Sequence, residues 1–262
     1  MTYLESSLKV SSPLLKLPLD DKEQVRLLSK QYGFDEGPME ADDPYKFKKE
    51  TLFERLNGKF GFSKKMLDLL PNGAVIVDIG AGNSLFDIAI AVAYRHKNFK
   101  FILVDGDQFD ESKMVWADKL FNENGYQPYN DWAFVKKTIA LNNLPLENFT
   151  FVSPADFKEC NATLVMSHSS WCWHYPYEEY IDIVKAGLQP GGFFLLSPAL
   201  NARNLKEKIN QEFGNPFKFE MHTFRPGIDH SLKESQRIYD QINEGILDPI
   251  NFKFFGIWQR AL

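Results

Sequence analysis

The sequence predicts an α/β protein with a seven-stranded, doubly wound sheet and an N-terminal helical cap. Three observations predict this fold. Short apolar runs alternate with helical repeats, several of these runs end in an acid, and a glycine turn follows the first of them. Such alternation is typical of a largely parallel sheet covered by helices on both faces. At 262 residues the chain can form one large domain with a small cap, which we expect at residues 71–262 and 1–70.

The N-terminal part carries helix signals. Residues 1 to about 20 contain Ser-Ser pairs and prolines, which are typical of an irregular arm. Apolar residues then recur at helical spacing, and Pro71-Asn72-Gly73 ends the last repeat before the first strand. Helices are therefore predicted at about 20–33, 47–56 and 63–70.

The rest of the chain alternates between strand and helix patterns. The predicted strands cover 75–79, 101–105, 149–157, 162–167, 193–197, 217–224 and 250–258. The predicted helices between the later strands cover 131–141, 180–184, 204–213 and 231–246. We expect the last two strands to form an antiparallel hairpin beside parallel strands.

The turn after the first strand indicates a nucleoside-cofactor pocket. Gly80 and Gly82 would let backbone amides approach a ligand, and the helix N-terminus behind them favours electron-rich groups. A dinucleotide fingerprint needs a third glycine where this chain has Leu85. Asp78 would repel a pyrophosphate but suits a ligand with ammonium and sulfonium charges. The turn therefore points to S-adenosylmethionine.

A second acid follows the second predicted strand. Asp105 comes 25 residues after Gly80, close to the roughly 20 residues that separate the glycine loop from the ribose-binding acid in dinucleotide sites. It could accept hydrogen bonds from both ribose hydroxyls. Asp107 is the alternative, and Asp105 is favoured because Gly106 begins the turn.

With these motifs the chain resembles the class I S-adenosylmethionine-dependent methyltransferases over roughly residues 72–200. Ser84 replaces the third glycine of the family's first motif, and the family's frequent Leu-x-Pro-Gly-Gly turn occurs at 188–192. The resemblance implies a Rossmann-like methyltransferase sheet, S-adenosylmethionine as cofactor and methyl transfer as activity. It implies cofactor-binding roles for Asp78, Gly80, Gly82, Asn83, Asp105, Asp156, Phe157 and Ser167.

Two of these positions have alternative interpretations. By resemblance, Asp156 would bind the exocyclic amine of adenine and Phe157 would cover the ring. The alternatives are a helix-capping acid and a buried core phenylalanine, because phenylalanine is so often found in the core.

The segment after the fourth strand, 167–176, resembles a loop of predicted sugar O-methyltransferases of bacterial surface-polysaccharide biosynthesis. Indoles and phenols pack on the C–H faces of sugars, and hydroxyls and imidazoles satisfy sugar hydroxyls. The expected acceptor is therefore a small polar molecule, a sugar or nucleotide-activated sugar. The expected acceptor-binding residues are Trp171, Trp173, Tyr175, His222 and Arg203, although the arginine could equally be a surface ion-pair partner.

Methyl transfer to a hydroxyl needs a base, because the acceptor must lose its proton. His168 is our first candidate, since it follows the fourth strand and a neutral imidazole can accept a proton near pH 7. His174 is the second candidate and His222 the third. A hydrogen-bonded loop histidine is the alternative interpretation of each.

We expect no catalytic metal. Ser167 stands where the catechol-type members of the family carry an aspartate ligand, and a hard cation needs several carboxylates. Asp229 and His230 are the reserve candidates for a metal site.

Composition excludes several classes of partner. The net charge is −5, and no run of Lys or Arg is long enough to track phosphates, which argues against nucleic acid. Cys160 and Cys172 have neither disulfide nor zinc spacing. No apolar stretch approaches the roughly 18 residues of a membrane span. We therefore expect a cytoplasmic protein without a membrane partner, and leave oligomerisation open.

Three alternative functions are also considered. The methyl group could go to a carboxylate or phosphate oxygen, which needs no base. The chain could be a non-catalytic, cofactor-binding partner subunit, as Ser84 and the aromatic-rich stretch 116–132 suggest. A nicotinamide oxidoreductase is opposed by Asp78 and Leu85.

Overall fold

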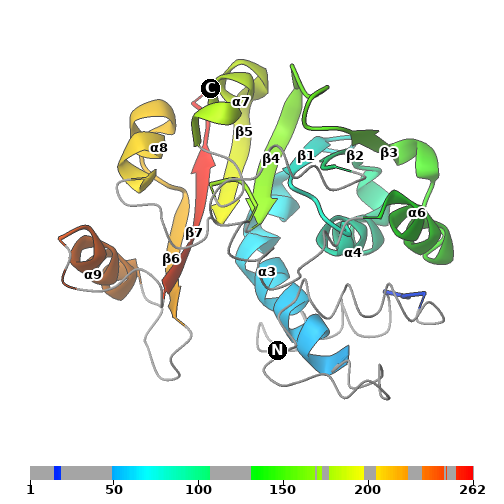
Figure 1. The fold of residues 1–262 in the computed structure, drawn as a ribbon, viewed down its shortest axis with the longest axis horizontal. Coiled ribbons are helices and arrows are strands. Elements are labelled where there is room, and N and C mark those ends of the chain that lie inside the picture. Colours follow the sequence, from blue (N-terminus) through cyan, green and yellow to red (C-terminus); the bar gives the residue numbers. More distant parts are fainter. Residues whose placement is uncertain are drawn as a thin grey trace, which may run out of the picture.

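The computed structural model describes residues 15–18, 49–106, 131–168, 170–172, 177–197, 205–223, 232–244, 246 and 252–261. In this part of the chain, strands and helices alternate and build a seven-stranded sheet with helices on both faces (Figure 1). The predicted fold class is confirmed.

The sheet has the strand order β3-β2-β1-β4-β5-β7-β6. Strands β1 to β5 run parallel, whereas β7 is antiparallel to both β5 and β6, which confirms the predicted antiparallel end of the sheet. The order reverses between β1 and β4, the place where open α/β sheets bind ligands. The strands are β1 (Val75–Ile79), β2 (Lys100–Val104), β3 (Phe149–Val152), β4 (Ala162–His168), β5 (Leu188–Ser197), β6 (Lys218–Thr223) and β7 (Phe252–Gln259).

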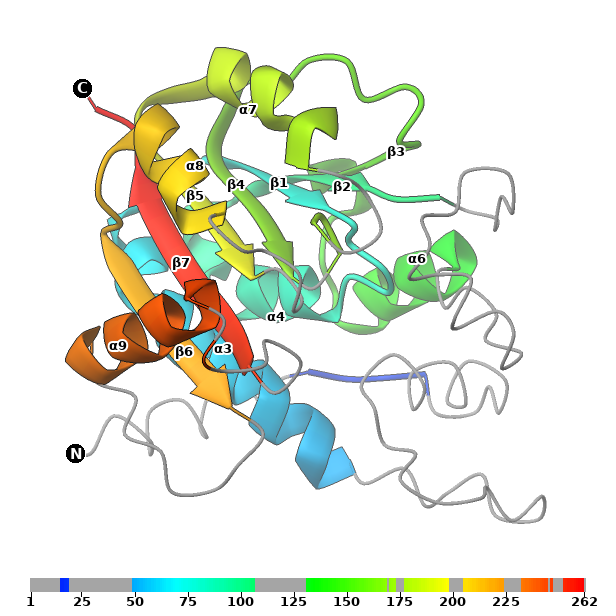
Figure 2. The ribbon, with the colours of Figure 1, turned by 60° about the vertical axis from the view of Figure 1, so that its left-hand side comes forward.

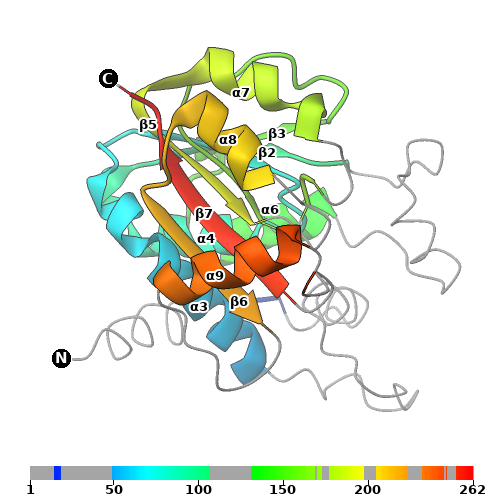
Figure 3. The same ribbon diagram turned by 90° about the vertical axis from the view of Figure 1, so that its left-hand side faces the viewer.

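Two cores lie on the two faces of this sheet (Figure 3). One contains residues of helices α3, α4 and α6, and the other contains residues of α7, α8 and α9. The helices are α3 (Lys49–Leu69), α4 (Leu85–Ala93), α6 (Trp132–Leu141), α7 (Ile181–Gly187), α8 (Leu205–Phe213) and α9 (Leu232–Asn243). Short 3₁₀ turns lie at Arg95–Lys97, Leu146–Asn148 and Tyr177–Glu179.

Strand alternation decides which polar residues share a face. Ile76 and Met166 belong to the core under α3 and α4, whereas Val77 and Val165 belong to the opposite core. Because side chains alternate along a strand, Asp78 on β1 and His168 on β4 lie on the α3/α4 face of the sheet.

The N-terminal helix differs from its prediction. Instead of two helices, α3 runs unbroken from Lys49 to Leu69, on the face of the sheet that lies behind β6 and β7 in Figure 2. Its interior glycine Gly58 costs about 1 kcal/mol relative to alanine. Burial offsets this cost, since the side chains of Met66 and Leu67 are completely inaccessible to solvent. These side chains share one core with β1 and α4.

Strand β5 also begins earlier than predicted, because the expected turn at 188–192 is itself the irregular start of the strand. The register shifts between Ala162 and Leu164 of β4, and Gly191 adopts a positive φ of 75°. The Gly191 amide donates to the carbonyl of Arg260, and the Arg260 amide donates to the carbonyl of Gly192. These two hydrogen bonds hold this segment against the end of β7.

Helices α6, α7, α8 and α9 follow their predictions to within a few residues, whereas the predicted helix at about 20–33 lies outside the described residues. Helix α6 begins where expected, with the Asp131 carboxylate accepting hydrogen bonds from the amides of Ala133 and Phe134. None of the described helices has the length and apolar character needed to cross a bilayer.

Candidate functional site

The turn after β1 and the tip of β2 lie against each other. The Gly80 amide donates to the carbonyl of Val104 at 2.8 Å. The Gly82 amide donates to Asp105 Oδ2 at 2.6 Å, and the Gly106 amide donates to Asp105 Oδ1 at 2.7 Å. The structure thus brings together three of the residues predicted to bind the cofactor: Gly80, Gly82 and Asp105.

A side chain of the protein itself lies against Gly80, where the sequence analysis expected the close approach of a ligand. A Cβ atom added at Gly80 would lie 1.8 Å from Ser170 Oγ, and the φ angle of Gly80 is +78°. The loop that follows β4 therefore closes directly over the turn that follows β1, and only glycine leaves room for it.

Ser167 links the same two loops. Its hydroxyl donates to the carbonyl of Ile79 at 2.6 Å and accepts from the amide of Trp171 at 3.0 Å, with no solvent exposure. The sequence suggests a cofactor-binding role for this residue. In the structure its hydroxyl ties the end of β4 to the end of β1.

A pair of buried carboxyl groups lies below the glycine turn. Asp78 on β1 and Asp87 in the first turn of α4 influence each other electrostatically, and both side chains are almost completely buried. Burial raises the pKa of Asp78 to about 7, with Asp105 raising it further and the Lys59 cation opposing the shift. Burial and the neighbouring Asp78 raise the pKa of Asp87 well above its usual range.

His168 ends β4 on the same face. Its ring meets Phe86 of α4 edge-on, with centroids 4.9 Å apart, and lies 6.4 Å from the ring of Phe255. Both ring nitrogens are shielded from solvent and have no hydrogen-bond partner in the described part of the chain. Burial, and secondarily the Lys59 cation, lowers the pKa of His168 well below 6.5, so the imidazole is neutral at pH 7.

Ser197 stands beside His168. The two residues are paired across β4 and β5, and the buried Ser197 hydroxyl also lacks a partner among the described residues. Two neighbouring side chains whose buried polar atoms lack partners among the described residues are unusual, because buried polar groups are normally hydrogen-bonded.

Three other predicted site residues lie elsewhere. Asp156 is exposed beyond β3 and accepts a hydrogen bond from Ser153 Oγ at 2.6 Å. Phe157 is buried and packs edge-on against Tyr180, which corresponds to the core alternative. Trp171 is completely buried in the second core, so its indole serves packing rather than the wall of a pocket.

Several predicted residues lie outside the described part of the chain: His174, Trp173, Tyr175, Arg203, Asp229 and His230. The backbone of His222 pairs with Lys253 near the end of β6. Asn83 is completely buried within the turn before α4. The described residues contain no group of three or more His, Cys, Asp or Glu side chains that could hold a metal ion.

The residues that the sequence analysis missed are Lys59, Asp87, Ser170 and Ser197. Asp87 had a visible signal, because it is the one acid in the apolar helix Leu85–Ala93. The other three have no sequence signal, since each acquires its neighbours only when distant elements pack together.

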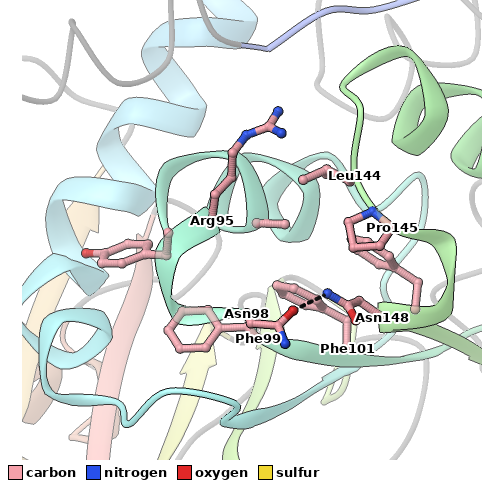
Figure 4. A pocket seen from close by; sticks show the side chains of 10 residues that line it. Arg95, Asn98, Phe99, Phe101, Leu144, Pro145 and Asn148 are labelled. Atoms are coloured by element: carbon pink, nitrogen blue, oxygen red, sulfur yellow. Dashed lines mark hydrogen bonds between the residues drawn. The ribbon is translucent and has the colours of Figure 1, made fainter.

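A pocket of about 140 Å³ lies at the opposite edge of the sheet, around the amino ends of β2 and β3 (Figure 4). Polar side chains that line it already form hydrogen bonds within the protein. The Asn148 amide donates to Asn98 Oδ1 at 2.8 Å, and the Arg95 guanidinium donates to the carbonyls of Asn142 and Asn143. This pocket is therefore separate from the polar groups around Asp78 and His168.

Comparisons with known proteins give structural likenesses. No protein-family model and no curated protein sequence matches the chain. A methyltransferase from Pyrococcus furiosus is similar at a TM-score of 0.44 and 14% identity, covering 79% of this chain and 83% of that one. Precorrin-6y C5,15-methyltransferase from Geobacter metallireducens gives 0.43 and 14%, with coverage of 76% and 87%. TYW2 from P. horikoshii in complex with MeSAdo gives 0.40 and 11%, with coverage of 76% and 61%.

Proposed function

We propose that this chain is an S-adenosylmethionine-dependent methyltransferase that transfers the methyl group to a hydroxyl oxygen of a small polar acceptor. A sugar or nucleotide-activated sugar is the acceptor class that the residues of the 167–176 loop favour. The observation that carries the proposal is the imidazole of His168, which has no hydrogen-bond partner among the described residues and shares one sheet face with the buried acid Asp78.

The acidic side chains around the glycine turn fit the proposed cofactor. Asp78 Oδ1 is buried and has no hydrogen-bond partner among the described residues, so it can bind the cationic methionine end of the cofactor. Asp105 stands at the tip of β2, where its carboxylate can exchange the Gly82 amide for ribose hydroxyls. When bound, the cofactor supplies a methyl group already activated by its sulfonium. The protein then has to align the acceptor and accept its proton.

The environment of His168 suits a hydroxyl acceptor. A neutral imidazole offers one nitrogen that accepts a hydrogen bond and one that donates. The Ser197 hydroxyl on the neighbouring strand can donate to the same acceptor oxygen. The Lys59 cation, which disfavours a charged imidazole, would also stabilise negative charge developing on that oxygen.

Calorimetry tests the cofactor. Titrating the full chain with S-adenosylmethionine and S-adenosylhomocysteine should give binding that Asp78→Asn weakens at least tenfold. Asp182→Asn is the matched control, because Asp182 is an exposed acid on α7. If neither ligand binds the wild-type chain at any pH, the proposed function is wrong.

A mass-shift screen tests the acceptor. Incubating the chain with S-adenosylmethionine and a panel of sugars and nucleotide sugars should yield a singly methylated product. His168→Ala should lower its rate by about 10²–10⁴-fold, the usual contribution of a general base. The matched control is His96→Ala, which alters an exposed histidine in the 3₁₀ turn before β2.

Two observations favour second candidates. Lys59 near His168 would suit a carboxylate or phosphate acceptor, which needs no base, and full turnover by His168→Ala would support this alternative. Ser170 over Gly80 and Asp105 on the Gly82 amide would suit a non-catalytic partner subunit, which methylation by the isolated chain would exclude.

A further inference from the structure

Helix α3 contacts the two aromatic rings that lie against His168. The Lys59 ammonium lies 5.8 Å from the centroid of the Phe86 ring. The Phe62 ring lies 5.4 Å from the ring of Phe255. Both contacted rings face the imidazole of His168, whose two nitrogens are shielded from solvent. An acceptor hydroxyl has to come within about 3 Å of one of these nitrogens to give up its proton. The described conformation is therefore closed over His168, and α3 is part of the closure.

The carboxyl-terminal half of α3 is held firmly from Phe62 onwards. The Lys218 ammonium, from β6, donates to the carbonyl of Phe62 at 3.2 Å and lies 4.3 Å from the centroid of its ring. Lys97 Nζ donates to the carbonyl of Leu67 at 3.1 Å and to that of Leu70 at 2.7 Å. Carbonyls at a helix end otherwise lack a partner within the helix. This half is therefore the fixed part of α3.

The middle of α3 has a low helix propensity. Gly58 and Gly61 lie in the interior of the helix, and neither has a positive φ angle. Glycine favours a helix less than any residue except proline, because it loses the most backbone freedom. A Cβ atom added at Gly58 would meet no atom within 4 Å, so packing does not require glycine there. The two glycines lie between the helices predicted at 47–56 and 63–70, so local propensity favours a break that the structure bridges.

We propose that α3 is a hinged lid over the acceptor site. The helix opens between Gly58 and Gly61, its carboxyl-terminal half stays on the sheet, and its amino-terminal half moves away from α4. Because Lys59 lies between the two glycines, opening breaks its contact with Phe86 and uncovers the imidazole of His168. The inference rests on the proposed function, in which His168 is the base, but the opening itself needs neither cofactor nor acceptor.

The rate at which diethyl pyrocarbonate modifies His168 in the free protein, at about pH 7, measures the opening. This reagent acylates a nitrogen of a neutral imidazole, so it reacts with His168 only while a nitrogen is accessible. His96 is the internal control, because it is exposed in the 3₁₀ turn Arg95–Lys97. Peptide mass spectrometry should show His168 modified at a measurable rate, roughly tenfold or more below that of His96, because reaction requires local opening.

Two variants shift the opening in opposite directions. Gly58→Ala raises the helix propensity of the hinge and should slow the modification of His168 about fivefold. Lys59→Gln removes the cation above the Phe86 ring and should speed the modification about two- to fivefold. Gln211→Ala is the matched control, because it raises helix propensity at an exposed position of α8. It should leave the modification rates of both histidines unchanged.

Modification of His168 as fast as that of His96 would overturn the closed site, and no modification of His168 would overturn its opening. A rate at His168 that Gly58→Ala leaves unchanged would overturn the hinge. None of these measurements needs a ligand, so absence of cofactor binding in calorimetry would remove the proposed function separately.

Turnover gives the second readout of the lid. In the methylation assay, Gly58→Ala should lower kcat/KM for the acceptor about fivefold, because only the open fraction admits the acceptor. The affinity for S-adenosylmethionine should stay at the wild-type value. An unchanged kcat/KM in a variant whose His168 modification is slowed would overturn the role of the lid in acceptor entry.

Discussion

At the scale of single residues, the most informative side chain is Asp87. It occupies the first turn of α4, where the helix dipole favours an anion, yet burial and the neighbouring Asp78 raise its pKa well above the usual range. A buried acid with a raised pKa weakens the native state at neutral pH, because the unfolded chain releases a proton that the folded chain retains. Such a cost is typical of functional sites, where stability is given up for chemistry.

We predict that Asp87→Asn stabilises the protein at pH 8. The folded pKa of Asp87 lies above the unfolded value of 3.8, so its contribution to stability is fully present below about pH 4 and declines as the pH rises. The advantage of the variant should therefore grow with pH, by about 1.4 kcal/mol per pH unit until the folded pKa is reached.

Urea unfolding of both chains at pH 5 and pH 8 measures this difference. Asp182→Asn serves again as the control, because Asp182 is exposed and its loss should leave the unfolding free energy within about 0.5 kcal/mol of wild type. An Asp87→Asn variant less stable than wild type at pH 8 would contradict the raised pKa of Asp87.

At the scale of elements, the site depends on how the loops after β1 and β4 hold each other. Ser167 joins Ile79 to Trp171 through one hydroxyl, and Ser170 lies against Gly80. The glycine turn, which a sequence pattern marks as a place for a ligand, is thus also a contact between two loops. Its glycine is required by the chain before any ligand is considered.

Two glycine substitutions separate the cost of a positive φ angle from the cost of the contact with Ser170. Gly80 and Gly73 both adopt a positive φ, of 78° and 70°, but a Cβ at Gly73 meets no atom within 4 Å. Gly73→Ala should therefore lower the unfolding free energy by only about 1 kcal/mol, the usual cost of a left-handed alanine. Gly80→Ala should lower it by about 1–3 kcal/mol more, because Ser170 must move.

Chemical unfolding measures how far each variant lowers the unfolding free energy, and cofactor calorimetry provides a second readout. Gly80→Ala should also weaken cofactor binding, whereas Gly73→Ala should not, since Gly73 precedes β1 at the other end of the strand. Equal losses of stability would refute the close contact with Ser170.

At the scale of the whole molecule, the sheet separates a rigid centre from its edges. Strands β1, β4 and β5 each pair with neighbours on both sides, while β3 and β6 are the outermost strands of the described sheet. The carboxyl ends of β1 and β4 carry Asp78 and His168, so the proposed chemistry lies on the most firmly held part of the molecule.

Hydrogen exchange should report this arrangement. Amides of β1 and β4, buried and bonded on both sides, should be the slowest to exchange, because opening them requires near-global unfolding. Amides of β3 and β6 should exchange at least tenfold faster after correction for intrinsic rates. Mass spectrometry of short peptides measures this order, and equal protection in β6 and β1 would contradict it.

The sequence by itself determined the type and order of the elements, the parallel sheet with its antiparallel end, and the meeting of the glycine turn with Asp105. These follow from patterns of period 2 and 3.6 and from turn residues, which act over a few neighbours along the chain. It placed the break within α3 and the start of β5 wrongly, because burial and pairing overrode local glycine and proline signals.

The tertiary structure alone decided which polar groups meet. Lys59, Asp87 and Ser197 come from α3, α4 and β5, and their relation to Asp78 and His168 depends on how those elements pack. It also decided that Trp171 and Phe157 belong to the core. Packing between elements sets these neighbourhoods, because burial and desolvation depend on residues far apart in the chain, and no local pattern records them.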